Sequence, residues 1–217
     1  MRPEFAAAID PIFYEVLSFR ELMRSQQYVT ADVRASILKS IDTAEIKIKD
    51  PKEWKLSQLA LCAWIDALLI DADWTGSTWW ENNCLEVHYF GARRSYGEFF
   101  QWAKEAAILP RKDALEVFYL AVVLGFRGLY ADPDTASRSN WISNLQLPDT
   151  IEDWCRITAR SLQLSQGRPE PREIPLVRST AKPLHGPAKL AVYSMIGSLL
   201  AGLAAGTAIL VFKLMDF

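Results

Sequence analysis

Few residues in this chain have the types and the spacing that catalysis requires. The two histidines are His88, which lies between apolar residues in the run LEVHYF, and His185, which lies among prolines and small residues. A single histidine in an apolar run is more often a packed, hydrogen-bonded residue than a base or a metal ligand. The motifs GxGxxG, GxxxxGKS/T, HExxH and GxSxG do not occur. The sequence therefore gives no support to a nucleotide, zinc-protease or serine-hydrolase site.

The cysteines and the net charge exclude further classes of site. Cys62, Cys84 and Cys155 are far apart and form no CxxC or Cys/His spacing, so we expect reduced thiols and no metal or cofactor. The formal net charge is −2, which gives no electrostatic footprint for nucleic acid.

Three acidic residues are the remaining candidates for chemistry. Asp71 and Asp73 are close enough in sequence to act as acid and base or to hold a metal, but a helix end that leads into a solvated loop explains them more simply. Asp66 lies in the middle of the apolar run LCAWIDALLI, where an unpaired carboxylate would be costly to bury. We expect an arginine, Arg127 or Arg94, to pair with it, and we interpret Asp66 as structural rather than catalytic.

Aromatic residues gather around these acids, and most of them must be core. Trp74 and Trp79 lie on a loop with polar and small residues, so they are candidates to anchor a protein partner, together with the acids Asp71, Asp73 and Glu81. An alternative is that these tryptophans enter the membrane interface.

Hydrophobic spacing predicts the elements that position these residues. Apolar residues at helical intervals predict helices over residues 12–23, 30–50, 53–70, 95–108, 110–125 and from 148 onward. The helix over 53–70 is apolar nearly all round and is expected to be central. We interpret 132–144 as a surface loop, and 85–90 is the one weak strand pattern. The prediction is an all-α fold, a compact bundle of about seven helices.

The C-terminal run Leu190 to Phe212 has no charged residue. As a helix it would be roughly 34 Å long, enough to cross a hydrocarbon core of about 30 Å. The alternative is a buried core helix, but core helices of this length usually carry a polar stripe. We therefore expect a domain over 1–166, a Pro-rich linker over 167–189, a transmembrane helix over 190–212 and a short tail over 213–217.

The flanks and one face of this expected helix add two predictions. Basic residues gather before it, and Lys213 alone follows it, so the positive-inside rule places the domain in the cytoplasm and the tail in the periplasm. Acids and prolines interrupt the first residues, so we expect no signal peptide.

Small residues recur every four positions along this expected membrane helix, which permits self-association or pairing with another membrane helix. A lipid-facing helix rich in Gly and Ala is an equal alternative. These residues are Ser194, Ser198, Gly202 and Gly206.

The runs AWIDALLIDADW, LEVHYFG, GEFF, LEVFYL and LGFRGLY occur in this order between about Leu59 and Tyr130. With the expected anchor, they resemble the TssL/DotU family, tail-anchored inner-membrane proteins of bacterial type VI secretion systems related to the DotU (IcmH) subunit of type IVB systems. The family usually has Asp-Glu in the central helix, whereas Asp66 is followed here by Ala67. Some relatives also carry a periplasmic wall-binding domain after the anchor.

The resemblance implies an assembly role without enzymatic activity. Its implied partners are a large inner-membrane protein of the TssM (IcmF-like) type, an outer-membrane lipoprotein of the TssJ type, and the baseplate and tail. The run LGFRGLY is interpreted as a helix end that defines the fold, and its members are Gly125, Phe126, Arg127, Gly128 and Tyr130. Two alternatives stay open: the corresponding type IVB subunit, and a membrane-tethered enzyme that uses Asp66, Asp71 and Asp73.

Overall fold

The computed structural model describes residues 1–23, 29–165 and the single residue Met195. The chain divides into two units, residues 1–169 and 170–217, and all described residues except Met195 belong to the first. The predicted linker (167–189), the predicted membrane helix (190–212, apart from Met195) and the tail (213–217) lie outside the described residues. Ser194, Ser198, Gly202 and Gly206, predicted to associate in the membrane, lie outside them too.

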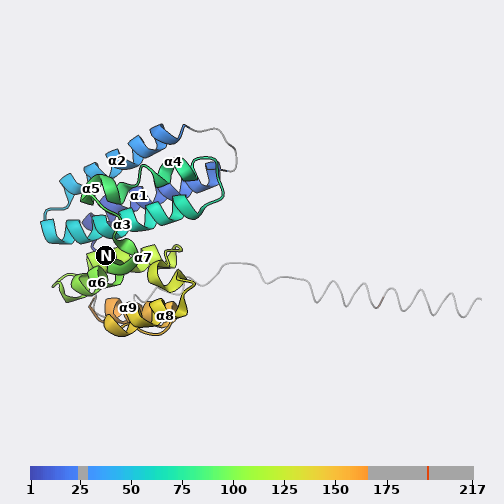
Figure 1. Cartoon of the computed structure of the whole chain (residues 1–217). Helices are drawn as coiled ribbons and strands as arrows, with labels where there is room; N and C mark the ends of the chain where they lie inside the picture. The colour runs from blue at the N-terminus through green and yellow to red at the C-terminus, as the bar shows by residue number, and fades with distance from the viewer. Residues whose placement is uncertain (24–28, 166–194, 196–217) are drawn as a thin grey trace, which may run out of the picture. The chain divides into compact units, whose positions relative to one another are not determined.

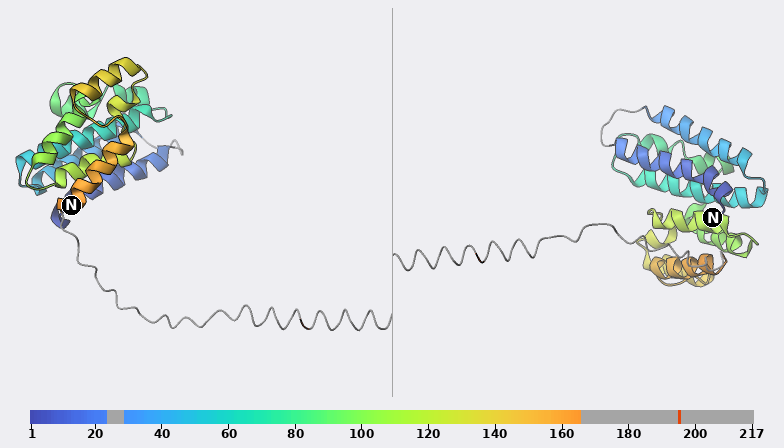
Figure 2. Two further views of the ribbon diagram at one scale, coloured as in Figure 1. Left: turned by 90° about the horizontal axis from the view of Figure 1, so that it is seen from below. Right: turned by 180° about the vertical axis from the view of Figure 1, so that it is seen from behind.

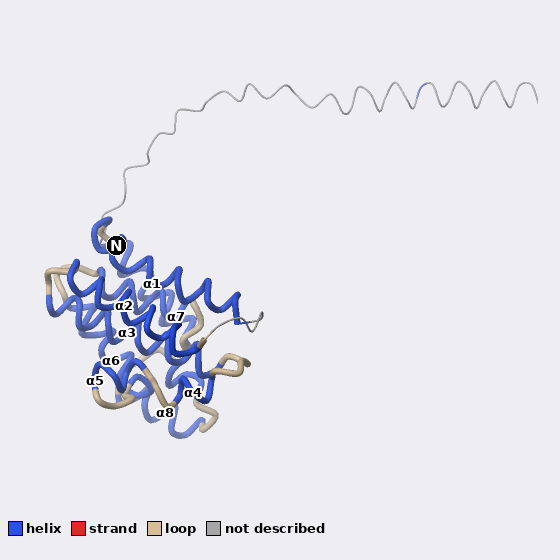
Figure 3. The backbone as a smooth tube through the Cα atoms, turned by 90° about the horizontal axis from the view of Figure 1, so that it is seen from above, coloured by secondary structure: helices blue, strands red, loops and turns tan. Residues whose placement is uncertain are grey.

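The described residues form helices joined by short loops, with no strand among them (Figure 3). Seven of these helices have ten residues or more, so the predicted all-α fold is confirmed. The helices are α1 (Pro3–Leu22), α2 (Thr30–Lys47), α3 (Pro51–Asp71), α4 (Ser77–Glu81), α5 (Leu85–Phe90), α6 (Ser95–Ile108), α7 (Asp113–Val123), α8 (Thr135–Asn144) and α9 (Ile151–Ser165), with the 3-10 turn η2 (Gly128–Ala131) after α7.

Two local predictions are wrong. The weak strand pattern over 85–90 is the short helix α5, and most of the predicted loop over 132–144 is helix α8. Asp134 caps α8, because its side chain accepts a hydrogen bond from the amide of Ala136. A cap of this kind starts a helix in a polar stretch that has no strong apolar period, which is why the hydrophobic pattern did not indicate one.

Helix α3 is central, as predicted. It begins at Pro51, and Asp50 caps it by accepting from the amides of Lys52 and Glu53. Figure 1 and Figure 2 show α1, α2, α4 and α5 on one side of α3 and α6 to α9 on the other, and α3 contacts α4, α5, α6 and α7. A helix covered on both sides needs an apolar surface nearly all round, which the sequence of α3 supplies.

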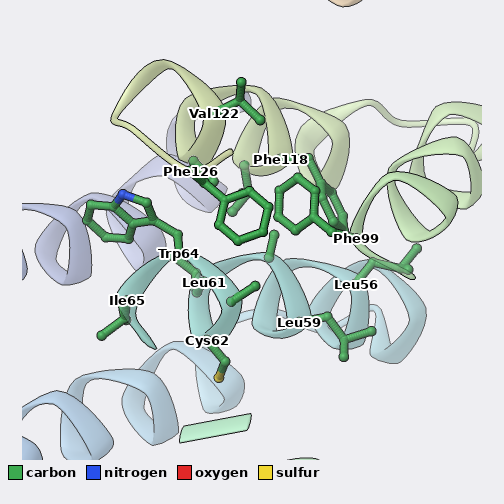
Figure 4. Close-up of a cluster of buried hydrophobic side chains, with 14 of the residues drawn as sticks. Leu56, Leu59, Leu61, Cys62, Trp64, Ile65, Phe99, Phe118, Val122 and Phe126 are labelled. Carbon is green, nitrogen blue, oxygen red and sulfur yellow. The ribbon is translucent and has the colours of Figure 1, made fainter. Parts of the chain in front are cut away.

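The core between α3, α6 and α7 combines aliphatic side chains with a group of aromatic rings (Figure 4). Phe99 packs edge-on against Phe118, with ring centroids 4.9 Å apart, and its centroid lies 4.0 Å from that of Phe126. Each such side chain stabilises the fold by roughly 1.5–3 kcal/mol when it is fully buried. The segment Asp113–Ala131 is long and apolar enough to cross a membrane, but its helix α7 packs against α3 and α9 in this core.

Candidate functional site

Asp66 lies at the centre of the domain and pairs with no arginine that the structure describes. Its side chain is 2% exposed. Oδ1 accepts from Trp80 Nε1 at 2.8 Å and from the amide of Leu85 at 2.9 Å, and Oδ2 accepts from the amide of Glu86 at 2.8 Å. The expected ion pair with Arg127 or Arg94 is therefore wrong. Arg127 instead donates to the carbonyl oxygens of Val122 and Phe126.

The three donors explain why α3 tolerates a buried carboxylate. Helix α5 begins without a capping side chain of its own, since its N-cap residue is Cys84. The first amides of a helix have no partner within it and carry a partial positive charge, so a carboxylate from another helix is a suitable acceptor. Burial raises the pKa of Asp66 to about 6 even though all three hydrogen bonds favour the ionised form.

Glu86 repeats this arrangement one helix further along the chain. It is 2% exposed, and its Oε1 accepts from the amides of Ser95 at 2.9 Å and Arg94 at 3.2 Å. Its Oε2 accepts from the Ser95 hydroxyl at 2.7 Å. Asp66 on α3 thus caps α5, and Glu86 on α5 caps α6; we call this pair the carboxylate relay. Sequence reasoning missed Glu86, and the available signal was the lack of a good capping residue before α5 and α6.

The predicted partner-binding residues divide into an exposed group and a buried one. Asp71, Asp73, Trp79 and Glu81 are exposed on the end of α3, the next turn and α4, and we call them the acidic edge. Glu81 is 3.7 Å from the Arg93 guanidinium. No group of three or more His, Cys, Asp or Glu side chains placed to hold a metal ion occurs among the residues that the structure describes.

Trp74 is not an exposed anchor, so its predicted place on the partner surface is wrong. Its side chain is 8% exposed, packs edge-on against Phe19 and donates its indole hydrogen bond to the carbonyl oxygen of Leu69. A loop tryptophan that follows an apolar helix end can fold back onto that end, because its N–H satisfies one of the last unpaired carbonyls.

The run LGFRGLY forms the turn after α7. Gly125 and Gly128 have φ of 118° and 51°, a region that other residues adopt only at a cost. A Cβ at Gly128 would lie 2.9 Å from a ring atom of Phe126, which is buried. Tyr130 donates its hydroxyl hydrogen bond to the carbonyl oxygen of Pro148 at 2.7 Å. These contacts are those of a turn that fixes the path of the backbone.

This turn also forms one wall of a cleft of about 450 Å³. The other walls are the C-terminal ends of α1 and α3 and the beginning of α6. Three arginines line it, Arg20, Arg93 and Arg127, and we call it the arginine cleft. Asp71 belongs to both the cleft and the acidic edge. Sequence reasoning did not find this cleft, because its arginines come from three distant parts of the chain.

A family comparison agrees with the resemblance seen in the sequence. The sequence model of the family described as type VI secretion system protein DotU matches residues 4–215. The chain belongs to this DotU family. The predicted family is therefore confirmed, and the match covers the described domain as well as most of the residues beyond it.

Two solved structures resemble the DotU-family domain described here. The cytoplasmic domain of TssL from Acinetobacter baumannii is 20% identical with a TM-score of 0.53, over 71% of this chain and 98% of that chain. SciP/TssL from enteroaggregative Escherichia coli 042 is 22% identical with a TM-score of 0.46, over 65% and 89%. The first likeness shows a shared fold. No curated protein matches the chain.

Proposed function

We propose that this chain is a structural component of the type VI secretion membrane complex. It recruits the baseplate and tail at the bacterial inner membrane through its N-terminal domain, and it is needed for effector delivery. The observation that carries the proposal is the DotU family match over residues 4–215. The all-helical domain, which shares its fold with a TssL cytoplasmic domain, supports the same role.

The proposed topology is a single pass with the helical domain in the cytoplasm and the C-terminus in the periplasm. Its support is the uncharged run over 190–212 and the basic residues that precede it. The proposed partners are a TssM/IcmF-like inner-membrane protein, baseplate proteins and, indirectly, a TssJ-like lipoprotein. Self-association through the membrane helix would use the small residues Ser194, Ser198, Gly202 and Gly206.

The proposed role is not enzymatic. Asp66, the buried member of the three candidate acids, already accepts three hydrogen bonds and is 2% exposed. Its carboxylate therefore has no open position for a substrate. Asp71 and Asp73 are exposed to solvent. Normal secretion from a folded Asp66→Asn variant would exclude a catalytic role for this carboxylate.

The acidic edge is the proposed docking surface for the baseplate. Its acids are exposed and can pair with basic residues of a partner, and Trp79, 38% exposed, adds an aromatic contact of the kind that often dominates binding. Charges at the rim of an interface mainly steer association, so their reversal should weaken docking without affecting the fold.

Two measurements test the proposal in the bacterium that makes this protein. Deletion should abolish effector delivery, and the full chain should restore it. A chain with Asp71→Lys, Asp73→Lys and Glu81→Lys should restore it poorly, whereas a control that reverses the exposed acids Asp10, Glu45 and Glu105 should restore it fully. Normal delivery without the chain would overturn the proposal, and normal delivery by the first variant would exclude the acidic edge as the docking surface.

The partners are tested by extraction in mild detergent and mass spectrometry of the proteins that co-purify with the tagged chain. A TssM/IcmF-like protein together with a TssJ-like lipoprotein is the expected result. Type IVB components in their place would show that the chain serves the other secretion system.

A further inference from the structure

The arginine cleft has the chemistry of a site for negatively charged protein. We propose that it binds an acidic segment of a protein partner, in which a carboxylate lies next to an apolar side chain. The proposal rests on the proposed function, because a recruiting domain needs surfaces for partner segments. It adds a second surface beside the acidic edge, with the opposite preference in charge.

The arginines of the cleft keep hydrogen-bonding capacity for a ligand. Arg20, in the last turn of α1, is exposed and makes no hydrogen bond or ion pair with another residue that the structure describes. Within the described part of the chain, Arg93 makes one loose ion pair, to Glu81 at 3.7 Å. Arg127 donates to two carbonyl oxygens through one nitrogen. A guanidinium has five N–H donors and matches a carboxylate with two parallel hydrogen bonds.

Trp64 supplies an independent observation. It lines the cleft and is 1% exposed, and its Nε1 has no hydrogen-bond partner among the described residues. Its ring packs against Phe13, with centroids 4.8 Å apart, and Figure 4 shows the nitrogen on the edge of the indole that faces away from α3. An unpaired buried N–H costs about 1–3 kcal/mol, and Trp80 avoids this cost by donating to Asp66. Trp54 Nε1 is unpaired in the same way. A carboxylate or a peptide carbonyl would satisfy Trp64 Nε1 only after a shift of the side chains that cover it.

The rest of the lining determines which kind of ligand fits. Apolar side chains of α3, among them Leu68 and Ile70, and the buried ring of Phe126 form part of the cleft, which suits an apolar side chain of the ligand. Among the described residues that line the cleft there are three arginines and two acids, Asp71 and Asp132. The charge that remains is positive, so the cleft favours an acidic segment over a basic one. A volume of about 450 Å³ is enough for a few residues of a peptide.

The cleft and the acidic edge form one continuous surface, because Asp71 belongs to both. A partner that covers both must present a basic part to the edge and an acidic part to the cleft. Because the acidic edge and the arginine cleft prefer opposite charges, the partner can dock in one orientation only. Rotation of the partner would bring like charges together.

The test is photo-crosslinking in living cells with the full-length chain. The probe is p-benzoylphenylalanine in place of Ala131, an exposed residue that lines the cleft, and then in place of Pro133. After irradiation, the crosslinked peptide of the partner is sequenced. The expected result is a segment with Asp or Glu next to an apolar residue. A basic or uncharged segment, or no crosslinked protein from either position, would overturn the proposal; the second result would leave a small anion as the ligand.

Charge reversal shows whether the arginines are responsible. Arg20→Glu should reduce the yield of the crosslink at least tenfold, while folding is unaffected because Arg20 has no partner to lose among the described residues. Arg160→Glu, the same charge change at an exposed residue on α9 outside the cleft, should leave it unchanged. An acid-to-Lys change in the crosslinked segment should restore the crosslink to Arg20→Glu. Equal yields for both arginine variants would contradict the proposal.

Failure of the proposed function can be distinguished from failure of the acidic-segment proposal. If deletion of the chain leaves effector delivery intact, the recruiting role is wrong whatever is crosslinked. If deletion abolishes delivery but Arg20→Glu leaves the crosslink intact, only the acidic-segment proposal is wrong.

Discussion

Two acids in the C-terminal part of α3, Asp66 and Asp71, have opposite environments. Asp66 is 2% exposed and accepts three hydrogen bonds, whereas Asp71, five residues later, is exposed and lies at the end of the helix. The first carboxylate connects elements of the fold, and the second is available to a partner. Residue type alone therefore does not assign a role to an acid on this helix; the donors around it do.

Removal of the buried carboxylate should have the largest effect on stability. Asp66→Ala leaves one indole N–H and two backbone N–H groups without an acceptor in the core, and we expect a loss of about 3 kcal/mol or more in the free energy of unfolding. Urea denaturation followed by tryptophan fluorescence measures this loss. Asp71→Ala is the control on the same helix and should change stability by less than about 0.5 kcal/mol. Similar losses for both variants would mean that Asp66 and Asp71 contribute equally to the stability of the fold.

The stability of the protein should depend on pH through the buried carboxylate of Asp66. Because the pKa of Asp66 is raised to about 6 in the folded protein and is about 3.9 when unfolded, the folded state binds its proton more tightly. Protonation of Asp66 therefore adds to the free energy of unfolding. This contribution is fully present below about pH 4 and is lost as the pH rises through 6. It amounts to at most about 3 kcal/mol.

The measurement is urea denaturation at pH 7, 6 and 5. Stability should rise as the pH falls through this range, and the rise should be absent in Asp66→Asn, which cannot titrate. An unchanged pH profile in that variant would assign the effect to another group.

Two buried tryptophans also differ in their hydrogen bonds, and their substitution should change stability by a smaller amount. Trp80→Phe removes a hydrogen bond to Asp66, whereas Trp64→Phe removes an N–H that has no partner among the described residues. Both variants lose similar ring volume, so the difference between them reports the hydrogen bond. We expect Trp80→Phe to be the less stable by about 1–2 kcal/mol in urea denaturation. Equal losses would mean that Trp64 also has a partner in solution.

The acidic edge should show the smallest effect on stability. Asp71→Lys, Asp73→Lys and Glu81→Lys are each expected to change the free energy of unfolding by less than about 0.5 kcal/mol, because exposed charges and a 3.7 Å surface ion pair contribute little. Thermal denaturation by circular dichroism measures this change. A loss of more than 1 kcal/mol in any of them would place that acid with Asp66 among the residues that hold the fold.

Much of the fold could be predicted from hydrophobic spacing, because a helix with a buried face has a strong period. The predicted helix over 95–108 coincides with α6, and the apolar run of α3 indicated a central helix. Spacing failed for α5 and α8, which are short or polar and begin at caps rather than at apolar stripes. The period of a sequence does not carry the information in a cap supplied by another helix.

The candidate site was predictable only in part. The mid-helix position of Asp66 indicated a buried acid in need of partners, but the partners are backbone amides and an indole, which no charge pattern reveals. The exposed acids were found because they lie at a helix end. Trp74 was misassigned, since a loop tryptophan can fold back onto the preceding helix, and the arginine cleft depends on which distant segments the fold brings together.

In the carboxylate relay, each acceptor precedes in the chain the helix start that it caps. Starting a helix is unfavourable, because several residues must be fixed before the first hydrogen bond forms. Here α3 carries the acceptor for the start of α5, and α5 carries the acceptor for the start of α6. As the chain leaves the ribosome, each of these two helices meets an acceptor that has already been made, so the N-terminal half can direct the folding of the residues that follow.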